Sequence, residues 1–130
     1  MLRIIACVFI GSGIGGALRY LVSVWVNNWF RGSTSPAAIF PWATLFVNIA
    51  GCFIIGLLYG LIDSHTVEMS PATKALLTTG FCGGLTTFST FSHENYILFQ
   101  SGNPGITLLY AALSIVIGFG AAWLGHTLVR

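Results

Sequence analysis

The chain has 130 residues, of which 55% are hydrophobic and only 6% are charged, and its formal net charge is +2. A soluble domain usually carries about 25% charged residues, so too few charges remain here to cover a surface that faces water. The composition therefore predicts an integral membrane protein, and the small, scattered positive charge argues against a nucleic-acid partner.

Four apolar segments lie between short polar loops, and each is long enough for a membrane span, which needs about 20 residues. We expect an all-α fold with one transmembrane domain over residues 1–130 and spans at about 3–30, 39–62, 71–99 and 106–129. The three cysteines form no CxxC pair. The sequence also holds no Ser/His/Asp set, paired carboxylates or metal motif, which argues against an enzyme.

The first span combines small residues with one charge. Gly11 and Gly15 have the GxxxG spacing that favours close packing of two helices. Arg19 follows on the same span, where a charge costs about 2.5–3.5 kcal/mol if it lies near the membrane centre. Such an arginine either faces the protein interior or water, or extends its head group to the interface, and the sequence leaves both alternatives open.

The second and fourth spans carry polar stripes. Thr44 and Asn48 are four residues apart and share a helical face, as do Tyr110, Ser114 and Gly118. A deep amide such as that of Asn48 either joins two helices by hydrogen bonds or offers its two N–H donors to a pore.

The third span contains the stretch Gly80–Ser92, GFCGGLTTFSTFS, which is rich in glycine and then in hydroxyls. The glycines at 80, 83 and 84 predict a helix break near the middle of the membrane, where free backbone groups could bind an ion. Polar, irregular backbone at that depth is tolerated only inside protein or beside an aqueous cavity. We therefore expect a permeation or binding site here. On the residues alone, the alternatives are that Phe88 and Phe91 are packing residues and that Glu94 is an interfacial carboxylate.

The orientation of the chain in the membrane is weakly specified by its charges. With the N-terminus inside the cell, Arg3, Lys74 and Arg130 lie inside and Arg31 lies outside, which is a small bias for the rule that places positive loops in the cytoplasm. Insertion in both orientations is therefore one prediction, and two opposed copies would form a two-fold dimer.

At this point the sequence resembles the Fluc (CrcB-type) fluoride channels, and the resemblance covers essentially the whole chain. The segments that carry it are GGLTTFSTFS at Gly83–Ser92, GGALRY at Gly15–Tyr20 and PWATLFVN at Pro41–Asn48. A small proton-coupled multidrug exporter is the alternative of similar size. We would expect a carboxylate deep in its first span, and the only acids here are Asp63, Glu68 and Glu94.

The resemblance implies a fluoride-selective passive channel of the cell inner (plasma) membrane that exports fluoride. It implies an antiparallel, dual-topology homodimer with two pores in the lipid bilayer. It also implies a structural sodium ion at the dimer centre, held by backbone carbonyls of Gly83 and Thr86 from both subunits. A non-transporting membrane assembly subunit is a third hypothesis.

The resemblance also assigns the pore residues. It places Phe88, Phe91, Asn48, Tyr110, Ser114, Thr44, Ser89 and Thr87 along the fluoride pathway, and Arg19 and Glu94 in the vestibule. A second serine that some relatives carry one turn after Ser114 is Gly118 here. The hydroxyl track on the last span is therefore expected to be shorter in this chain.

Overall fold

The computed structural model describes all 130 residues and is entirely helical. The elements in order are α1 (Leu2–Trp29), the 3₁₀ turn η1 (Pro36–Ala38), α2 (Trp42–Asp63), α3 (Pro71–Ala75), the π-helical η2 (Leu76–Cys82), α4 (Gly83–Leu85), α5 (Phe88–Gln100) and α6 (Pro104–Leu128). Three helices, α1, α2 and α6, are long and apolar enough to cross a membrane. The expected all-α fold is confirmed.

The third segment is broken, but not where the glycines predicted. The chain stays helical through Gly80, Gly83 and Gly84 and leaves the helix only at Thr86 and Thr87. Both threonines are extended, with ψ of 157° at Thr86 and 124° at Thr87. The predicted position of the break was therefore wrong by a few residues.

Two of the three glycines instead allow a close approach to α1. A Cβ atom on Gly80 would lie 3.0 Å from the Cα of Gly11, and one on Gly84 would lie 2.8 Å from the Cα of Ser12. The Ser12 Oγ donates to the Gly80 carbonyl over 3.4 Å. Gly15 is likewise buried, and a Cβ there would lie 2.7 Å from the backbone nitrogen of Leu85. The predicted small-residue face of α1 is confirmed, with η2 and α4 as its partner.

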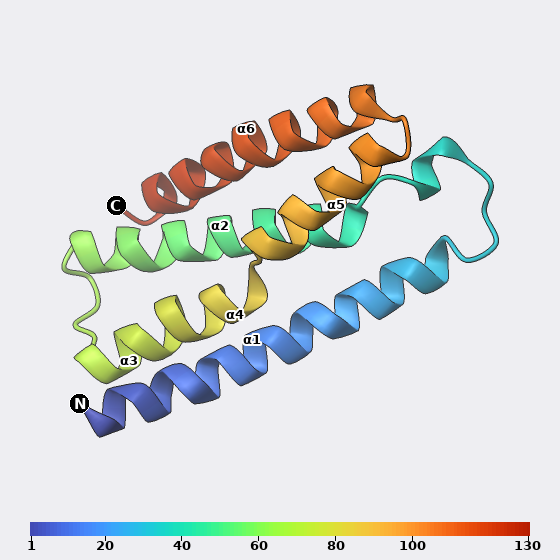
Figure 1. Cartoon of the computed structure of the whole chain (residues 1–130). Coiled ribbons are helices and arrows are strands. Elements are labelled where there is room, and N and C mark those ends of the chain that lie inside the picture. Colours follow the sequence, from blue (N-terminus) through green and yellow to red (C-terminus); the bar gives the residue numbers. More distant parts are fainter.

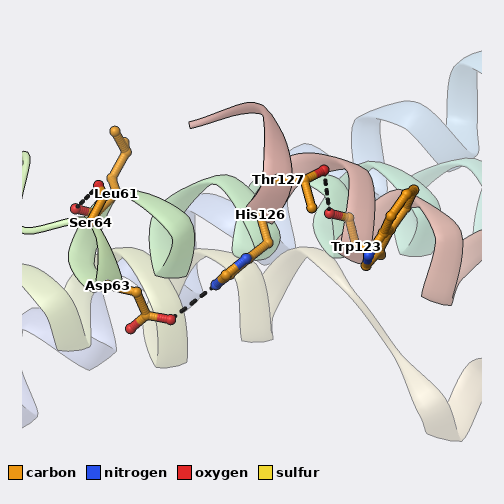
Figure 2. A network of polar contacts seen from close by, with 6 residues as sticks. All are labelled: Leu61, Asp63, Ser64, Trp123, His126 and Thr127. Atoms are coloured by element: carbon orange, nitrogen blue, oxygen red, sulfur yellow. Dashed lines mark hydrogen bonds and ion pairs between the residues drawn. The ribbon is translucent and has the colours of Figure 1, made fainter. Parts of the chain in front are cut away.

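The remaining helices are arranged around α2 (Figure 1). The most extensive packing joins α2 to α6, while α1 packs mainly on η2 and α4, and α5 packs mainly on α6. Both termini lie at the same end of the molecule (Figure 1). At that end a polar contact links α2 to α6, with His126 Nε2 2.9 Å from the Asp63 carboxylate (Figure 2).

Candidate functional site

The break between α4 and α5 is held by one amide side chain from α2. The Nδ2 of Asn48 donates to the Thr87 carbonyl over 3.2 Å, and the Thr87 N–H donates to the Asn48 Oδ1 over 2.8 Å. Thr87 also caps α5, because its Oγ1 accepts from the Thr90 N–H at 3.2 Å. Asn48 thus joins two segments, and the second hydrogen on Nδ2 is left for another acceptor.

A groove with a volume of about 610 Å³ runs along the break. Seven of the residues that the sequence singled out line it: Asn48, Gly83, Thr86, Thr87, Phe88, Phe91 and Ser114. The sequence reasoning did not single out Thr78, Thr79 or Tyr59 for this surface. The adjacent threonines Thr78 and Thr79 within an apolar span were the signal that could have found two of them.

The two phenylalanines of the motif differ in how much of this chain surrounds them. The ring centroids of Phe88 and Phe91 lie 5.8 Å apart with planes inclined at 36°. Phe91 also packs on Tyr110, with centroids 5.1 Å apart, whereas Phe88 is 80% exposed. Phe91 is therefore anchored by the chain's own core, whereas most of the Phe88 side chain is left uncovered by the single chain.

The carboxylate of Glu94 accepts two hydroxyl hydrogen bonds inside the helix bundle. Thr44 Oγ1 donates to Oε1 and Tyr110 Oη donates to Oε2, both over 2.7 Å. The Tyr110 side chain is fully buried. The hydroxyls of Thr44 and Tyr110 therefore lie on the carboxylate of Glu94 and not along the groove. Hydrogen bonds to a charged carboxylate are among the stronger ones in proteins.

Glu94 and Thr44 also border a smaller cavity of about 320 Å³. Ser23 and Asn27 from α1 and Thr90 from α5 supply its other polar walls. Arg19 is half-buried one turn before Ser23, but it neither lines this cavity nor forms an ion pair within the chain. The two expected vestibule residues are thus not brought together in one cavity.

The hydroxyl stripe of α6 continues into the groove through Ser114. Its Oγ is buried and has no hydrogen-bond partner in the chain. Gly118, one turn later, is buried against α2, where a Cβ would lie 3.5 Å from the Cys52 Sγ. Ser89 lies exposed at the start of α5, with its Oγ 3.4 Å from the Thr87 Oγ1. Ser114 is therefore the one hydroxyl of the stripe without a hydrogen-bond partner in the chain.

The backbone at the break offers acceptors to a cation. The carbonyls of Gly83 and Thr86 accept no backbone hydrogen bond, because the Thr87 N–H turns to Asn48 and the Thr90 N–H turns to the Thr87 hydroxyl. Carbonyl oxygens suit hard cations such as sodium. No cluster of three or more His, Cys, Asp or Glu side chains forms a rival metal site.

Comparisons with known proteins agree with the resemblance read from the motifs. The model of the family described as CrcB-like protein, Camphor Resistance (CrcB), matches residues 6–126. A protein of Flavobacterium psychrophilum named fluoride-specific ion channel FluC is 41% identical over 99% of this chain and 98% of its own length. Proteins with the same name from Azobacteroides pseudotrichonymphae and Pseudomonas fluorescens are 43% and 42% identical over 100% of this chain and 98% and 99% of their own lengths. With nearly its whole length matched, the chain belongs to the CrcB family.

Proposed function

We propose that the protein is a passive, fluoride-selective ion channel, a multi-pass protein of the cell membrane and not an enzyme. It exports fluoride down its gradient through a single four-helix transmembrane domain spanning residues 1–130. The observation that carries this proposal is the groove at the break, which Asn48, Ser114 and two phenylalanines line together. Full-length relatives that carry the name fluoride-specific ion channel support the choice of ion.

The groove has the chemistry that an anion needs in a medium of low dielectric. A bare ion there loses tens of kcal/mol of hydration by Born estimates, so the pathway must supply donors. The second amide hydrogen of Asn48 and the unpartnered hydroxyl of Ser114 provide them. Aromatic rings have positive edges, so Phe88 and Phe91 presented edge-on attract a small anion while their bulk excludes a larger one. Thr87 and Ser89 add hydroxyls at the start of α5.

The assignment of Glu94 and Arg19 to the vestibule rests on their charges. Glu94 lies behind Thr44 and Tyr110, so its charge is partly compensated by two hydroxyl donors. Arg19 has no ion-pair partner in the chain and does not line the Glu94 cavity, so it would act on anions only through its long-range positive potential. A channel of this kind tolerates the carboxylate near its mouth because both carboxylate oxygens already accept hydrogen bonds.

The channel works as an antiparallel dual-topology homodimer with two pores and a central structural sodium ion. The 80% exposure of Phe88 supports a second copy that completes each pore. The free carbonyls of Gly83 and Thr86 support the sodium site, and two copies are needed because one chain offers too few oxygens there. The sodium, when bound, supplies positive charge between the pores.

Fluoride efflux from proteoliposomes tests the proposal, with an ion-selective electrode as readout and chloride as the control ion. The protein should release fluoride rapidly and retain chloride. Phe88→Ala and Phe91→Ala should each reduce fluoride flux while the dimer persists. Phe119→Ala is the matched control, because this ring on α6 is 76% exposed and lies outside the groove. No fluoride loss from a folded dimer would refute the channel, and transport of hydrophobic cations driven by a pH gradient would indicate the exporter instead.

A further inference from the structure

A second groove, wholly apolar, lies between the C-terminal part of α1 and the N-terminal part of α2. It has a volume of about 380 Å³ and is lined by eight hydrophobic side chains, among them Trp25, Trp29, Phe30, Trp42 and Ile49. Three of the four tryptophans of the chain are in this one place. Phe30 and Trp42 also line the smaller cavity beside Glu94, but none of the five residues lines the groove at the break, so the apolar groove needs its own explanation.

The break in the third segment creates this groove. The N-terminal part of α1 packs on η2 and α4, which end at Leu85. After the break, α5 packs on α6 and α2 and makes no packing contact with α1 (Figure 1). Beyond the break, therefore, α1 packs directly on α2 alone, and the smaller cavity beside Glu94 separates it from α5. Two helices alone leave an open furrow between their side chains, and the tryptophans form its walls.

The position of the tryptophans shows where the groove lies relative to a bilayer. Trp25 and Trp29 are 73% and 79% exposed near the end of α1, and the Trp42 Nε1 donates to the Ala37 carbonyl over 2.8 Å. Tryptophan, with its large apolar body and the single N–H at its tip, favours the membrane–water boundary. From Trp42 to Ile49 the groove follows α2 for seven residues, about 10 Å of helix. It therefore runs from the boundary into the hydrocarbon region.

One unpaired cation lies next in sequence to a residue that lines the groove. Arg31 follows Phe30 directly, is exposed and forms no ion pair. The other Lys and Arg residues near helix ends are Arg3 beside the N-terminus, Lys74 in α3 and Arg130 at the C-terminus, and Figure 1 shows both termini and α3 at the end of the molecule opposite the α1–α2 connection. Residues 1–62 contain no Asp or Glu, and the carboxylate of Glu94 already accepts two hydroxyl bonds. The guanidinium of Arg31 therefore has no counter-ion at its end, and its planar donors match a phosphate.

We propose that this groove binds one anionic phospholipid, with an acyl chain against the tryptophans and the phosphate on Arg31. The acyl chain gains little over the surrounding bilayer, because lipid tails are already in an apolar solvent. The head-group charge therefore sets the selectivity. A juxtamembrane arginine attracts anionic lipid by about 1 kcal/mol, which corresponds to a preference of about fivefold over a zwitterionic lipid.

Quenching of tryptophan fluorescence by brominated lipids tests this site in the full-length protein. The Trp123→Phe variant keeps only the three groove tryptophans, and it is reconstituted in phosphatidylcholine vesicles. Brominated phosphatidylglycerol should quench it at about a fivefold lower mole fraction than brominated phosphatidylcholine. Arg31→Gln should abolish this preference and Arg31→Lys should keep it, whereas Arg3→Gln, at the other end of α1, should leave it unchanged.

A second variant supplies the control signal. With Trp25, Trp29 and Trp42 changed to Phe, the emission comes from Trp123, which is 62% exposed on α6, and Arg31→Gln should not alter its quenching. Equal quenching of the groove tryptophans by the two lipids, or a preference that survives Arg31→Gln, would overturn the proposal. Protection of the groove tryptophans from both lipids would also overturn it and would identify a second copy of the chain as the occupant. Fluoride efflux from the same vesicles reports separately on the channel.

Discussion

The two hydrogen bonds between Asn48 and Thr87 allow a sharp prediction, because one side chain pairs both the N–H and the carbonyl of Thr87. Asn48→Ala removes a donor 3.2 Å from the Thr87 carbonyl and an acceptor 2.8 Å from the Thr87 N–H. Each hydrogen bond contributes about 0.5–1.5 kcal/mol net, and a buried group left without a partner costs about 1–3 kcal/mol. Thr87 is half-buried beside the groove, so water can replace part of the loss. We expect a destabilisation of about 2–4 kcal/mol.

Asn95→Ala is the matched control for this substitution. The Asn95 Nδ2 donates to the Phe91 carbonyl of its own helix over 2.9 Å, so no bond across the break is lost. We expect a cost of no more than about 1 kcal/mol for it. Equilibrium unfolding in mixed micelles, followed by helical circular dichroism, compares the two variants.

Hydrogen exchange gives a second, local readout of the same two hydrogen bonds. The Thr87 amide should exchange faster in Asn48→Ala than in the unmodified chain, and it should stay protected in Asn95→Ala. If Asn48→Ala were as stable as Asn95→Ala to within about 0.5 kcal/mol, and Thr87 stayed protected, the claim that Asn48 holds the break would be refuted.

Two further substitutions test the packing and the buried carboxylate. Gly15→Ala should destabilise the fold by about 1–3 kcal/mol, because its Cβ would overlap the backbone of the third segment. In Gly13→Ala the Cβ meets nothing within 4 Å, so this control should be neutral or slightly stabilising. Thermal unfolding in detergent compares the two variants, and equal midpoints would contradict the close-packing argument. Tyr110→Phe keeps the buried ring but removes the 2.7 Å hydrogen bond to Glu94. It should lower the free energy of unfolding by about 1–3 kcal/mol and also change the fluoride flux. An unchanged unfolding midpoint would show that the carboxylate does not depend on this hydroxyl.

The sequence was sufficient for conclusions that depend on composition and on local spacing. The scarcity of charge identified a membrane protein, because a bilayer-facing surface needs no charges. The spacing of Gly11 and Gly15 identified a packing face, because residues four apart lie on the same side of any helix. The hydroxyl-rich motif with Phe88 and Phe91 marked the region of the groove, and its match in order with two other segments indicated the family.

The tertiary structure alone decided what depends on contacts between distant segments. The break falls at Thr86 and Thr87 rather than at the glycines, because Gly80 and Gly84 pack in helical conformation against α1 and because Asn48, 39 residues away, satisfies Thr87.

The hydrogen-bond partners of the Tyr110 and Thr44 hydroxyls also depend on contacts between distant segments. Tyr110 and Thr44 share helical faces with groove residues, yet both donate to Glu94, from 16 and 50 residues away along the chain. Helical spacing fixes which residues share a face. The rotation of each helix about its axis, set here by close glycine contacts, determines what that face meets.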